Sequence, residues 1–249
     1  MWEGQLAFAE QGWRVIAPQL RGFDDLGGQV SARPEETGPP TAVRREETYP
    51  ASVDDYAGDV IDLLDALHID TAVIGGLSMG GYIAFAILRH AARYVHGLIL
   101  ADTRSQADTP GDADGRKRML QLVQDKGPAA VAGEMLPKLL GDTTRAAHPE
   151  VAEQVRSLIL SNSANAIAGA IRALMTRPDS TPLLQTIHFP TLIMVGAEDA
   201  VTPPSAAEEM HRRIAGSQLT IIPAAGHLTN LEQPQAFNEA LARFLGHRV

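Results

Sequence analysis

The stretch Gly76-Leu77-Ser78-Met79-Gly80-Gly81 follows a short apolar run, Thr71–Gly76, and opens a segment with helical spacing, Met79–His90. This is the pattern G-x-S-x-G between a strand and a helix, where it forms a sharp, strained turn that exposes the serine. Small residues two before and two after the serine are expected to keep the backbone from clashing. We therefore expect Ser78 to be a nucleophile at the positive end of a helix. The Met79 N–H would face the oxyanion that forms on attack.

This stretch allows two other interpretations. A glycine-rich connection between a strand and a helix, with an ordinary serine, would give the same letters. A dinucleotide-binding fingerprint, G-x-G-x-x-G, is the competing motif. It fails because a start at Gly75 requires a glycine where Leu77 stands, and it leaves Ser78 without a role. The strand before the turn and the helix after it favour the nucleophile.

Outward from this turn, short apolar runs alternate with segments at helical spacing. The runs are continuous, which is typical of strands buried on both faces of a parallel sheet. The predicted strands are Trp13–Pro18, Thr71–Gly76, Val95–Ala101, Thr191–Gly196 and Gln218–Pro223. The predicted helices are Trp2–Gln11, Asp54–Leu67, Met79–His90, Pro204–Ala215 and Pro234–Leu245. This alternation predicts an α/β fold with a mostly parallel sheet flanked by helices.

Two stretches break the alternation. Gly27–Pro50 is polar and rich in glycine and proline, which predicts a loop. Thr103–Thr186 contains helical segments and no strand-like run; these segments are Arg116–Lys126, Pro128–Leu140, Pro149–Leu160 and Ala164–Met175. We therefore expect an α/β core of residues 1–102 and 187–249, with residues 103–186 inserted as an all-helical cap. Such a cap would cover the carboxyl ends of the strands, where open α/β sheets bind ligands.

A serine is a weak nucleophile until a base takes its proton. The sequence has eight histidines, and His227 differs from the rest in its position. It follows the predicted strand Gln218–Pro223, so it stands at the same edge of the sheet as Ser78. The other seven lie at helix ends, in the insertion or at the tail, where a surface role is the simpler interpretation. We therefore predict that His227 is the base.

The base needs a carboxylate that fixes its tautomer and stabilises the imidazolium. Asp199 comes just after Thr191–Gly196, one strand before the histidine, and is the expected acid. Two rivals stay open. Glu198 is adjacent but is expected to point the other way. Asp102 ends the strand Val95–Ala101, at an edge nearer to Ser78, and is a real alternative.

Composition excludes several other classes. The 249 residues are 45% hydrophobic and 20% charged, as in an ordinary globular protein. The absence of cysteine excludes disulfides, thiolate metal sites and a cysteine nucleophile, and the metalloprotease pattern H-E-x-x-H is also absent. A net charge of −9 argues against nucleic acid or an anionic membrane as a partner. With no signal-like N-terminus and no long apolar run, we expect a cytoplasmic protein that binds no metal.

The chain resembles serine hydrolases of the α/β-hydrolase fold, in the branch of the 3-oxoadipate enol-lactonase-like enzymes and carboxylesterases. Besides the serine turn, the matching text is Arg14–Pro18 with Arg21-Gly22-Phe23, Asp55–Val60, Pro190–Ile193 with Gly196–Asp199, and Gly226-His227-Leu228 with Leu231–Pro234. The order Ser78, Asp199, His227 is the order of nucleophile, acid and base in this fold. Ser78 also separates the chain from epoxide hydrolases and haloalkane dehalogenases, which attack with aspartate.

The resemblance implies cleavage of small carboxylic esters or lactones through an acyl-enzyme, without a cofactor. Two alternatives stay open. The same triad could serve perhydrolysis or the hydrolysis of a C–C bond, or the scaffold could be a catalytically weak binding protein. The sequence does not identify the natural substrate, and it leaves the oligomeric state open, a homo-oligomer included.

The resemblance also implies sheet strands and a His-Gly oxyanion loop before the helix Trp2–Gln11, and this chain has no counterpart for them. In such a fold, one of these strands lies between Trp13–Pro18 and Thr71–Gly76. We expect another segment to fill that gap, because facing backbone groups would otherwise lack partners. The candidates are residues encoded upstream, a rearranged part of Gly27–Pro50, or a strand of a neighbouring subunit. The source of a second oxyanion donor is open for the same reason.

Overall fold

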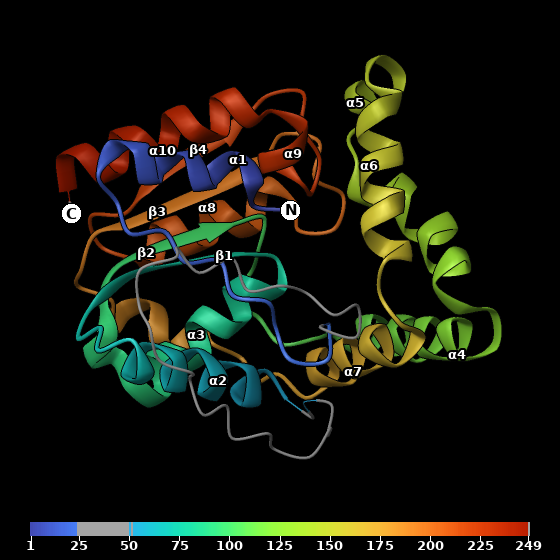
Figure 1. Ribbon diagram of the computed structural model, residues 1–249, viewed down its shortest axis with the longest axis horizontal. Coiled ribbons are helices and arrows are strands. Elements are labelled where there is room, and N and C mark those ends of the chain that lie inside the picture. The colour runs from blue at the N-terminus through green and yellow to red at the C-terminus, as the bar shows by residue number, and fades with distance from the viewer. Residues whose placement is uncertain (24–49, 51, 249) are drawn as a thin grey trace, which may run out of the picture.

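The computed structural model describes residues 1–23, 50 and 52–248. Its sheet consists of β1 (Ala72–Leu77), β2 (Val95–Ala101), β3 (Thr191–Gly196) and β4 (Gln218–Ile222). All neighbouring strands are parallel, in the order β1-β2-β3-β4 (Figure 1). The bounds of β2 and β3 are those predicted from the sequence, and β1 and β4 differ from prediction by one residue at their ends. The predicted α/β class with a parallel sheet is confirmed.

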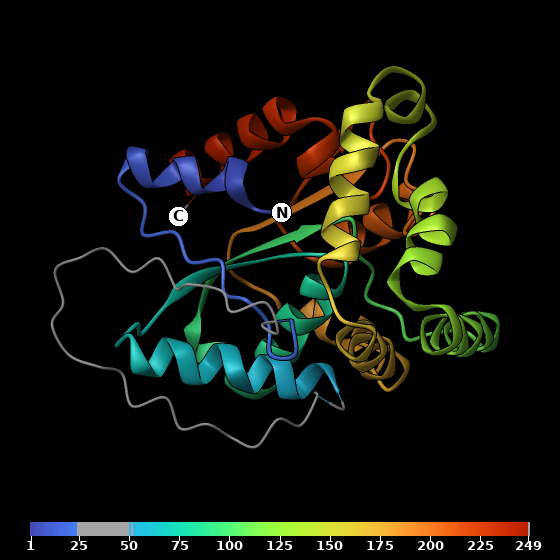
Figure 2. The same cartoon turned by 45° about the vertical axis from the view of Figure 1, so that its right-hand side comes forward.

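Helices cover both faces of this sheet (Figures 1 and 2). One face carries α2 (Val53–Ala66), α3 (Met79–Ala91) and α8 (Pro204–Arg213), and the other carries α1 (Glu3–Leu6), the 3-10 helix η1 (Ala7–Gln11) and α10 (Pro234–Arg248). The central strand β3 is buried throughout. Its Leu192 and Met194 contact the core under α10, whereas Ile193 and Val195 contact the core under α3 and α8. A strand with both faces covered needs a continuous apolar run, which is what the sequence has there.

Residues 13–18, predicted as a strand, form none in the structure. Trp13 and Val15 pack against the core beneath α10, and Ile16 is 39% exposed. A strand is stable when a neighbour satisfies its backbone N–H and C=O groups. Among the described residues, no strand pairs with the edge of β1 that faces away from β2. The prediction of a strand at residues 13–18 was therefore wrong. The run is largely apolar, but no described strand pairs with it.

Between β2 and β3 the described chain is helical. It forms α4 (Pro110–Leu139), α5 (Asp142–Ala147), α6 (Pro149–Leu160), α7 (Ala164–Met175) and the 3-10 helix η3 (Thr181–Thr186). The two helices predicted at the start of this insertion are the two halves of α4, which is interrupted at Gly127 with φ of 71° and ψ of −175°. Figure 1 shows α4 to α7 beyond the arrowheads of the strands, at their carboxyl ends. We call residues 103–186 the helical insertion.

The predicted loop Gly27–Pro50 lies, apart from Pro50, outside the described residues. As for membrane spans, no single helix in the described part of the chain has both the length and the apolar composition that crossing requires. The helices α6 and α7 meet that criterion only when they are taken together as a pair bent by 94°.

Candidate active site

Ser78 occupies the turn between β1 and α3. Its φ of 53° and ψ of −113° lie in a region that residues other than glycine rarely adopt. The end of β2 holds this turn in place. The Ser78 N–H donates to the Ala101 carbonyl at 2.9 Å, and the Thr103 hydroxyl donates to the Ser78 carbonyl at 2.8 Å. Neighbouring structure thus stabilises a backbone conformation that is unfavourable by itself.

The glycines around the serine differ in how much space a side chain would have at each position. A Cβ at Gly76 would lie 2.0 Å from the backbone carbon of Gly80, because the strand and the helix touch there. Among the described residues, and apart from the backbone of its own helix, a Cβ at Gly80 would meet no atom within 4 Å, so the expected need for a small residue two positions after the serine is wrong there. The second crowded position is Gly81, where a Cβ would lie 2.4 Å from Oγ1 of Thr103.

His227 links the serine to an acid. Its Nε2 lies 2.7 Å from Oγ of Ser78, and its Nδ1 lies 2.9 Å from Oδ2 of Asp199. The histidine side chain is 3% exposed and that of Asp199 is fully buried. In the tautomer that suits both contacts, Nδ1–H donates to the carboxylate and Nε2 accepts from the serine hydroxyl. The structure therefore brings together the three residues that sequence reasoning selected, Ser78, Asp199 and His227.

The surroundings of Asp199 favour its ionised form. Oδ1 accepts from the backbone N–H of Val201 at 2.8 Å and of Thr202 at 2.9 Å, and Oδ2 accepts from the Thr202 hydroxyl at 2.6 Å. Burial raises the pKa of the Asp199 carboxyl, but the hydrogen bonds and the charge interaction with His227, together with those from Thr202, outweigh it. The pKa therefore lies below its usual value. A carboxylate held in this way stabilises an imidazolium beside it.

The two rival acids have other partners. Asp102 is fully buried, and its carboxylate accepts from the Gly196 N–H at 2.9 Å and from the N–H and hydroxyl of Thr229. Burial raises the pKa of Asp102 to about 7, against the lowering effects of His227 and of these hydrogen bonds. Glu198 points toward the helical insertion, where it accepts from the N–H of Thr143 at 2.9 Å and from its hydroxyl at 2.5 Å.

Sequence reasoning missed the threonines that complete this site. Thr202 holds the acid, Thr229 holds Asp102, and Thr103 holds the carbonyl of Ser78. Thr202 stands three residues after Asp199, a spacing at which an aspartate often accepts hydrogen bonds from the following backbone. That spacing is a signal that the sequence offered. The bonds of Thr103 and Thr229 join residues that lie far apart in the sequence, and only the fold reveals them.

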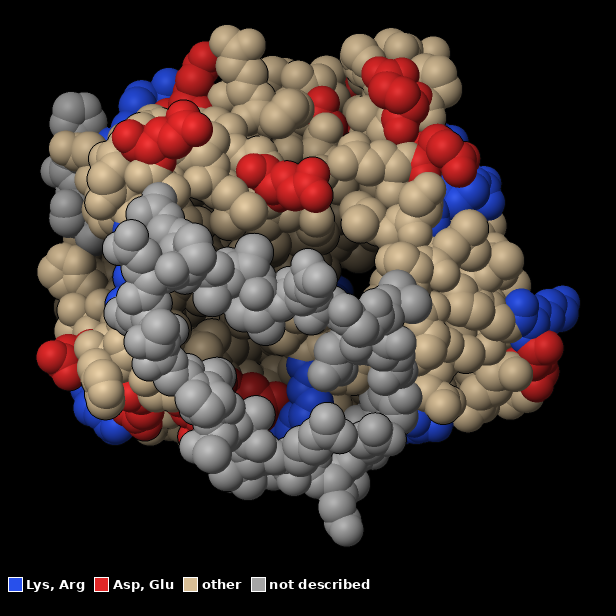
Figure 3. Space-filling view, in the orientation of Figure 1, with Lys and Arg blue, Asp and Glu red and all other residues tan. Residues whose placement is uncertain are grey.

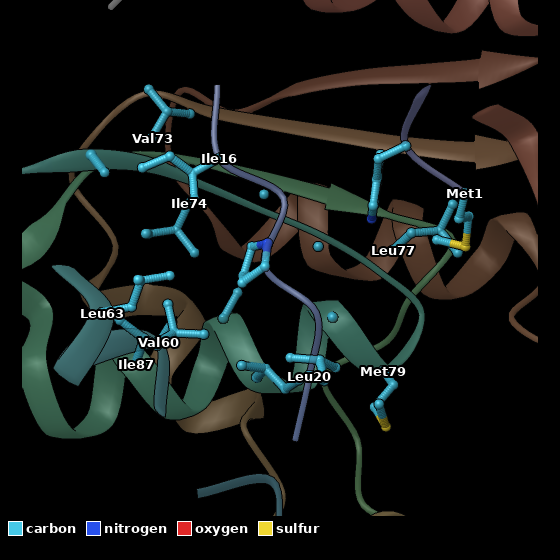
Figure 4. Close-up of a pocket in the computed structure, with 18 of the residues that line it drawn as sticks. Met1, Ile16, Leu20, Val60, Leu63, Val73, Ile74, Leu77, Met79 and Ile87 are labelled. Carbon is cyan, nitrogen blue, oxygen red and sulfur yellow. The ribbon is translucent and has the colours of Figure 1, made fainter. Parts of the chain in front are cut away.

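A cavity of about 940 Å³ reaches the serine. One end is lined by Ser78, Met79 and His227, where Met79 is the first residue of α3. The rest follows the edge of β1 with which no described strand pairs, the place where the resemblance implies a further strand. What fills that stretch stays a prediction. Figure 4 shows two walls of this part of the cavity. Ile16, Val73 and Ile74 lie on one side, and Leu20, Val60, Leu63 and Ile87 lie on the other.

Charges on the surface are mixed. On the face shown in Figure 3, basic side chains lie beside acidic ones at several places. The ion pairs include Lys138 with Glu134 and Arg213 with Glu209, both between residues four apart on a helix. Within the described ranges, no group of three or more histidine, aspartate or glutamate side chains is placed to hold a metal ion.

Comparison with known proteins identifies the family of the chain. Residues 1–240 match the model of the alpha/beta hydrolase family. The chain is 30% identical over 241 residues to 3-oxoadipate enol-lactonase 2 of Acinetobacter baylyi, covering 97% of this chain and 82% of that protein. Among solved structures, a thermophilic esterase from Thermogutta terrifontis, with malate bound, is 38% identical with a TM-score of 0.86. That match covers 98% of this chain and 84% of the esterase.

The enol-lactonase from Burkholderia xenovorans is 26% identical with a TM-score of 0.73, over 80% of this chain and 75% of that one. Its likeness adds a lactonase of known structure to the esterase. The relatives therefore include proteins named as esterases and as lactonases. A family model that covers nearly the whole chain, and a relative of this similarity, lead to one conclusion: the chain belongs to the alpha/beta hydrolase family.

Proposed function

We propose that this hydrolase cleaves small carboxylic esters or lactones through an acyl-enzyme formed on Ser78. The observation that carries the proposal is the continuous hydrogen-bonded chain from Ser78 through His227 to Asp199. A hydroxyl, an imidazole and a buried carboxylate in this order make up the machinery of acyl transfer by serine. The esterase and enol-lactonase names of the relatives support the same substrate class.

The proposed reaction begins when Oγ of Ser78 attacks the carbonyl carbon while Nε2 of His227 takes the hydroxyl proton. Asp199 stabilises the imidazolium through its contact with Nδ1. The Met79 N–H, at the first residue of α3, donates to the oxyanion, aided by the positive end of that helix. The tetrahedral intermediate collapses, the C–O bond to the leaving group breaks, and His227 returns the proton to the leaving oxygen. Water then attacks the acyl-enzyme with His227 again as base. The bond between the acyl carbon and Oγ of Ser78 breaks, the carboxylic acid leaves, and His227 returns the proton to Oγ.

We further propose that the helical insertion acts as a cap on the core of residues 1–102 and 187–249. The main support is a direct contact between the insertion and the base, because the His227 N–H donates to the Leu139 carbonyl at 2.9 Å. Leu139 also lines the cavity at its serine end. The proposal includes no cofactor, since the three side chains supply every proton transfer. A net charge of −9 favours a small molecule over nucleic acid as the partner.

The test is the substitution Ser78→Ala, assayed with a short-chain chromogenic ester and with a serine-directed phosphonate. We expect turnover to fall by about 10⁴-fold or more, as in other enzymes that lose a triad serine, and phosphonate labelling to disappear. Ser205→Ala is the matched control, because Ser205 is an exposed serine on α8. More than a tenth of the activity surviving in Ser78→Ala would contradict the assignment. An unmodified protein that is inert in both assays would favour a binding role on this scaffold.

A further inference from the structure

Another buried carboxylate, Glu232, lies just after the loop that carries His227. It belongs to α9 (Thr229–Glu232), and the residue is 5% exposed. Its Oε1 accepts from the N–H of Gly226 at 2.9 Å and of Leu228 at 3.1 Å. Those are the two residues on either side of His227. The carboxylate therefore holds the backbone before and after the base.

The other oxygen of Glu232 reaches the helical insertion. Oε2 accepts from the N–H of Gly141 at 2.8 Å, just after α4 ends. Through the carbonyl of Leu139, the same segment also accepts from the N–H of His227. The loop of the base and residues 139–141 are thus joined twice, by one backbone hydrogen bond and through one buried side chain.

The two backbones that Glu232 joins lie in direct contact. A Cβ at Gly226 would lie 2.3 Å from the nitrogen of Gly141, and a Cβ at Gly141 would lie 2.9 Å from the nitrogen of Gly226. No side chain fits between them, and the N–H groups of Gly141 and Gly226 both donate to the carboxylate of Glu232. Three buried donors converge on two oxygens that only accept, so each is satisfied.

We propose that Glu232 is a positioning residue, which fixes the loop of His227 against residues 139–141 and so holds the imidazole within hydrogen-bond reach of Ser78. This inference rests on the proposed role of His227 as base. Glu232 acts through the backbone of its neighbours and does not touch the reacting atoms. A small displacement is enough to matter, because misplacing a catalytic group by about 1 Å costs roughly 10²-fold in rate.

The substitution Glu232→Gln separates positioning from size. Glutamine has nearly the same shape, but one of its two terminal groups is an NH₂ that would face a backbone N–H donor instead of accepting from it. Either the bonds around His227 or the bond to Gly141 must then break. The side chain still fills its space, so packing is preserved.

Glu198→Gln is the matched control. Glu198 also binds the insertion, through the N–H and hydroxyl of Thr143, two residues after Gly141. Among the hydrogen bonds of the described residues, its side chain makes none with Gly226 or Leu228. Both variants lose a carboxylate that binds the insertion near residues 141–143. Only Glu232→Gln also changes the hydrogen bonds to Gly226 and Leu228, on either side of His227. Glu232→Asp is the conservative variant, since it keeps the charge but retracts it by one methylene.

The experiment measures kcat and KM for a short-chain ester, the rate at which a small phosphonate labels Ser78, and the melting temperature. For Glu232→Gln we expect kcat and the labelling rate to fall together by roughly 10²-fold, with KM within about threefold. Glu198→Gln should stay within about threefold of the unmodified protein in both rates, and Glu232→Asp should lie in between.

Several results would overturn the proposal. One is an unchanged kcat and labelling rate in a folded Glu232→Gln protein. Another is an equal loss in Glu198→Gln, which would show that loosening the insertion is enough. If both Glu232 variants fail to fold, the residue is a folding determinant and the positioning role is wrong. Failure of the proposed function itself looks different, because the unmodified protein would then neither turn over esters nor react with the phosphonate.

Discussion

Asp102 and Asp199 are two buried aspartates that follow adjacent strands of one sheet, and they differ in what binds them. Asp102 comes directly after β2 and Asp199 three residues after β3, and their exposures are 0% and 3%. Asp199 contacts Nδ1 of His227, whereas Asp102 contacts Gly196 and Thr229. Burial and position at the end of a strand are therefore alike for the two, and the direction of the side chain separates them.

The difference also appears in their pKa values. Burial raises the pKa of both carboxyls, yet the bonds from His227 and Thr202 bring that of Asp199 below its usual value. For Asp102 burial prevails, and its pKa rises to about 7. Near neutral pH, Asp199 is ionised while Asp102 is partly protonated. Each carboxylate accepts from two backbone N–H groups and one threonine hydroxyl, so the contact with His227 is what distinguishes Asp199 from Asp102.

The largest effect is expected for Asp199→Asn. The amide NH₂ would face Nδ1 of His227 and favour the tautomer in which Nε2 carries the proton and cannot accept one from Ser78. We expect kcat for a short ester to fall by about 10⁴-fold, the drop seen for this change in another triad, with the fold retained. Steady-state kinetics and a melting curve are the measurements. A loss of less than tenfold would move the acid away from Asp199.

A smaller effect is expected for Thr202→Val, which removes the hydroxyl that donates to Oδ2 of Asp199 at 2.6 Å. Valine has nearly the same shape, and the Thr202 N–H still donates to Oδ1. One lost hydrogen bond to a charged group corresponds to a fall in kcat of about tenfold. Thr229→Val is the control on the other aspartate. If it matches the loss in Thr202→Val, the two carboxylates are not functionally distinct.

Asp102→Asn should change kcat by less than about fivefold, because it alters no contact of the imidazole ring. Its melting temperature should fall, since an amide replaces an acceptor for three donors, the N–H of Gly196 and the N–H and hydroxyl of Thr229. Kinetics are therefore compared per folded molecule, after the folded fraction is measured by circular dichroism. A greater loss than in Asp199→Asn would reverse the ranking and make Asp102 the acid.

The fold was predictable where the residues of one short stretch are enough to determine its secondary structure. The strands β2 and β3 are continuous apolar runs with covered faces, so their bounds were read correctly. Residues 13–18 are apolar too, but a strand also needs a partner, which local sequence does not contain. The helical character of residues 103–186 was predicted, and so was the break at Gly127 between the two halves of α4. The short elements α5 and η3 were not predicted.

The candidate site was predictable to the level of strand ends. Parallel strands bring their carboxyl ends to one edge, which was enough to select Ser78, His227 and two aspartates. The choice between the aspartates depends on which carboxylate contacts Nδ1 of His227. The role of Glu232 depends on a backbone contact between Gly141 and Gly226, 85 residues apart in sequence numbering. Such contacts follow from tertiary packing, and no spacing in the sequence reveals them.

The smallest effect, and the most direct measure of the contrast, is the dependence of stability on pH. A carboxyl whose pKa is lowered by folding stabilises the protein fully above the unfolded pKa, and this contribution is lost as pH falls through the folded pKa. For Asp199 that loss begins near the ordinary value of 3.8 and continues below it. A carboxyl whose pKa is raised acts in the opposite sense. The contribution of Asp102 is complete below 3.8 and is lost as pH rises through about 7.

Urea unfolding of the unmodified protein, Asp102→Asn and Asp199→Asn between pH 3 and pH 8 measures both contributions. The difference in free energy of unfolding between the unmodified protein and Asp199→Asn should be constant from about pH 5 to pH 8 and should shrink toward pH 3. The difference for Asp102→Asn should instead shrink as pH rises from 4 toward 7. In that range, unfolding of the unmodified protein releases the proton of Asp102, and the variant has no such proton to release. If the Asp102 difference is flat across that range, Gly196 and Thr229 keep this carboxylate ionised as well. The two aspartates would then differ in the direction they point, and no longer in their charge.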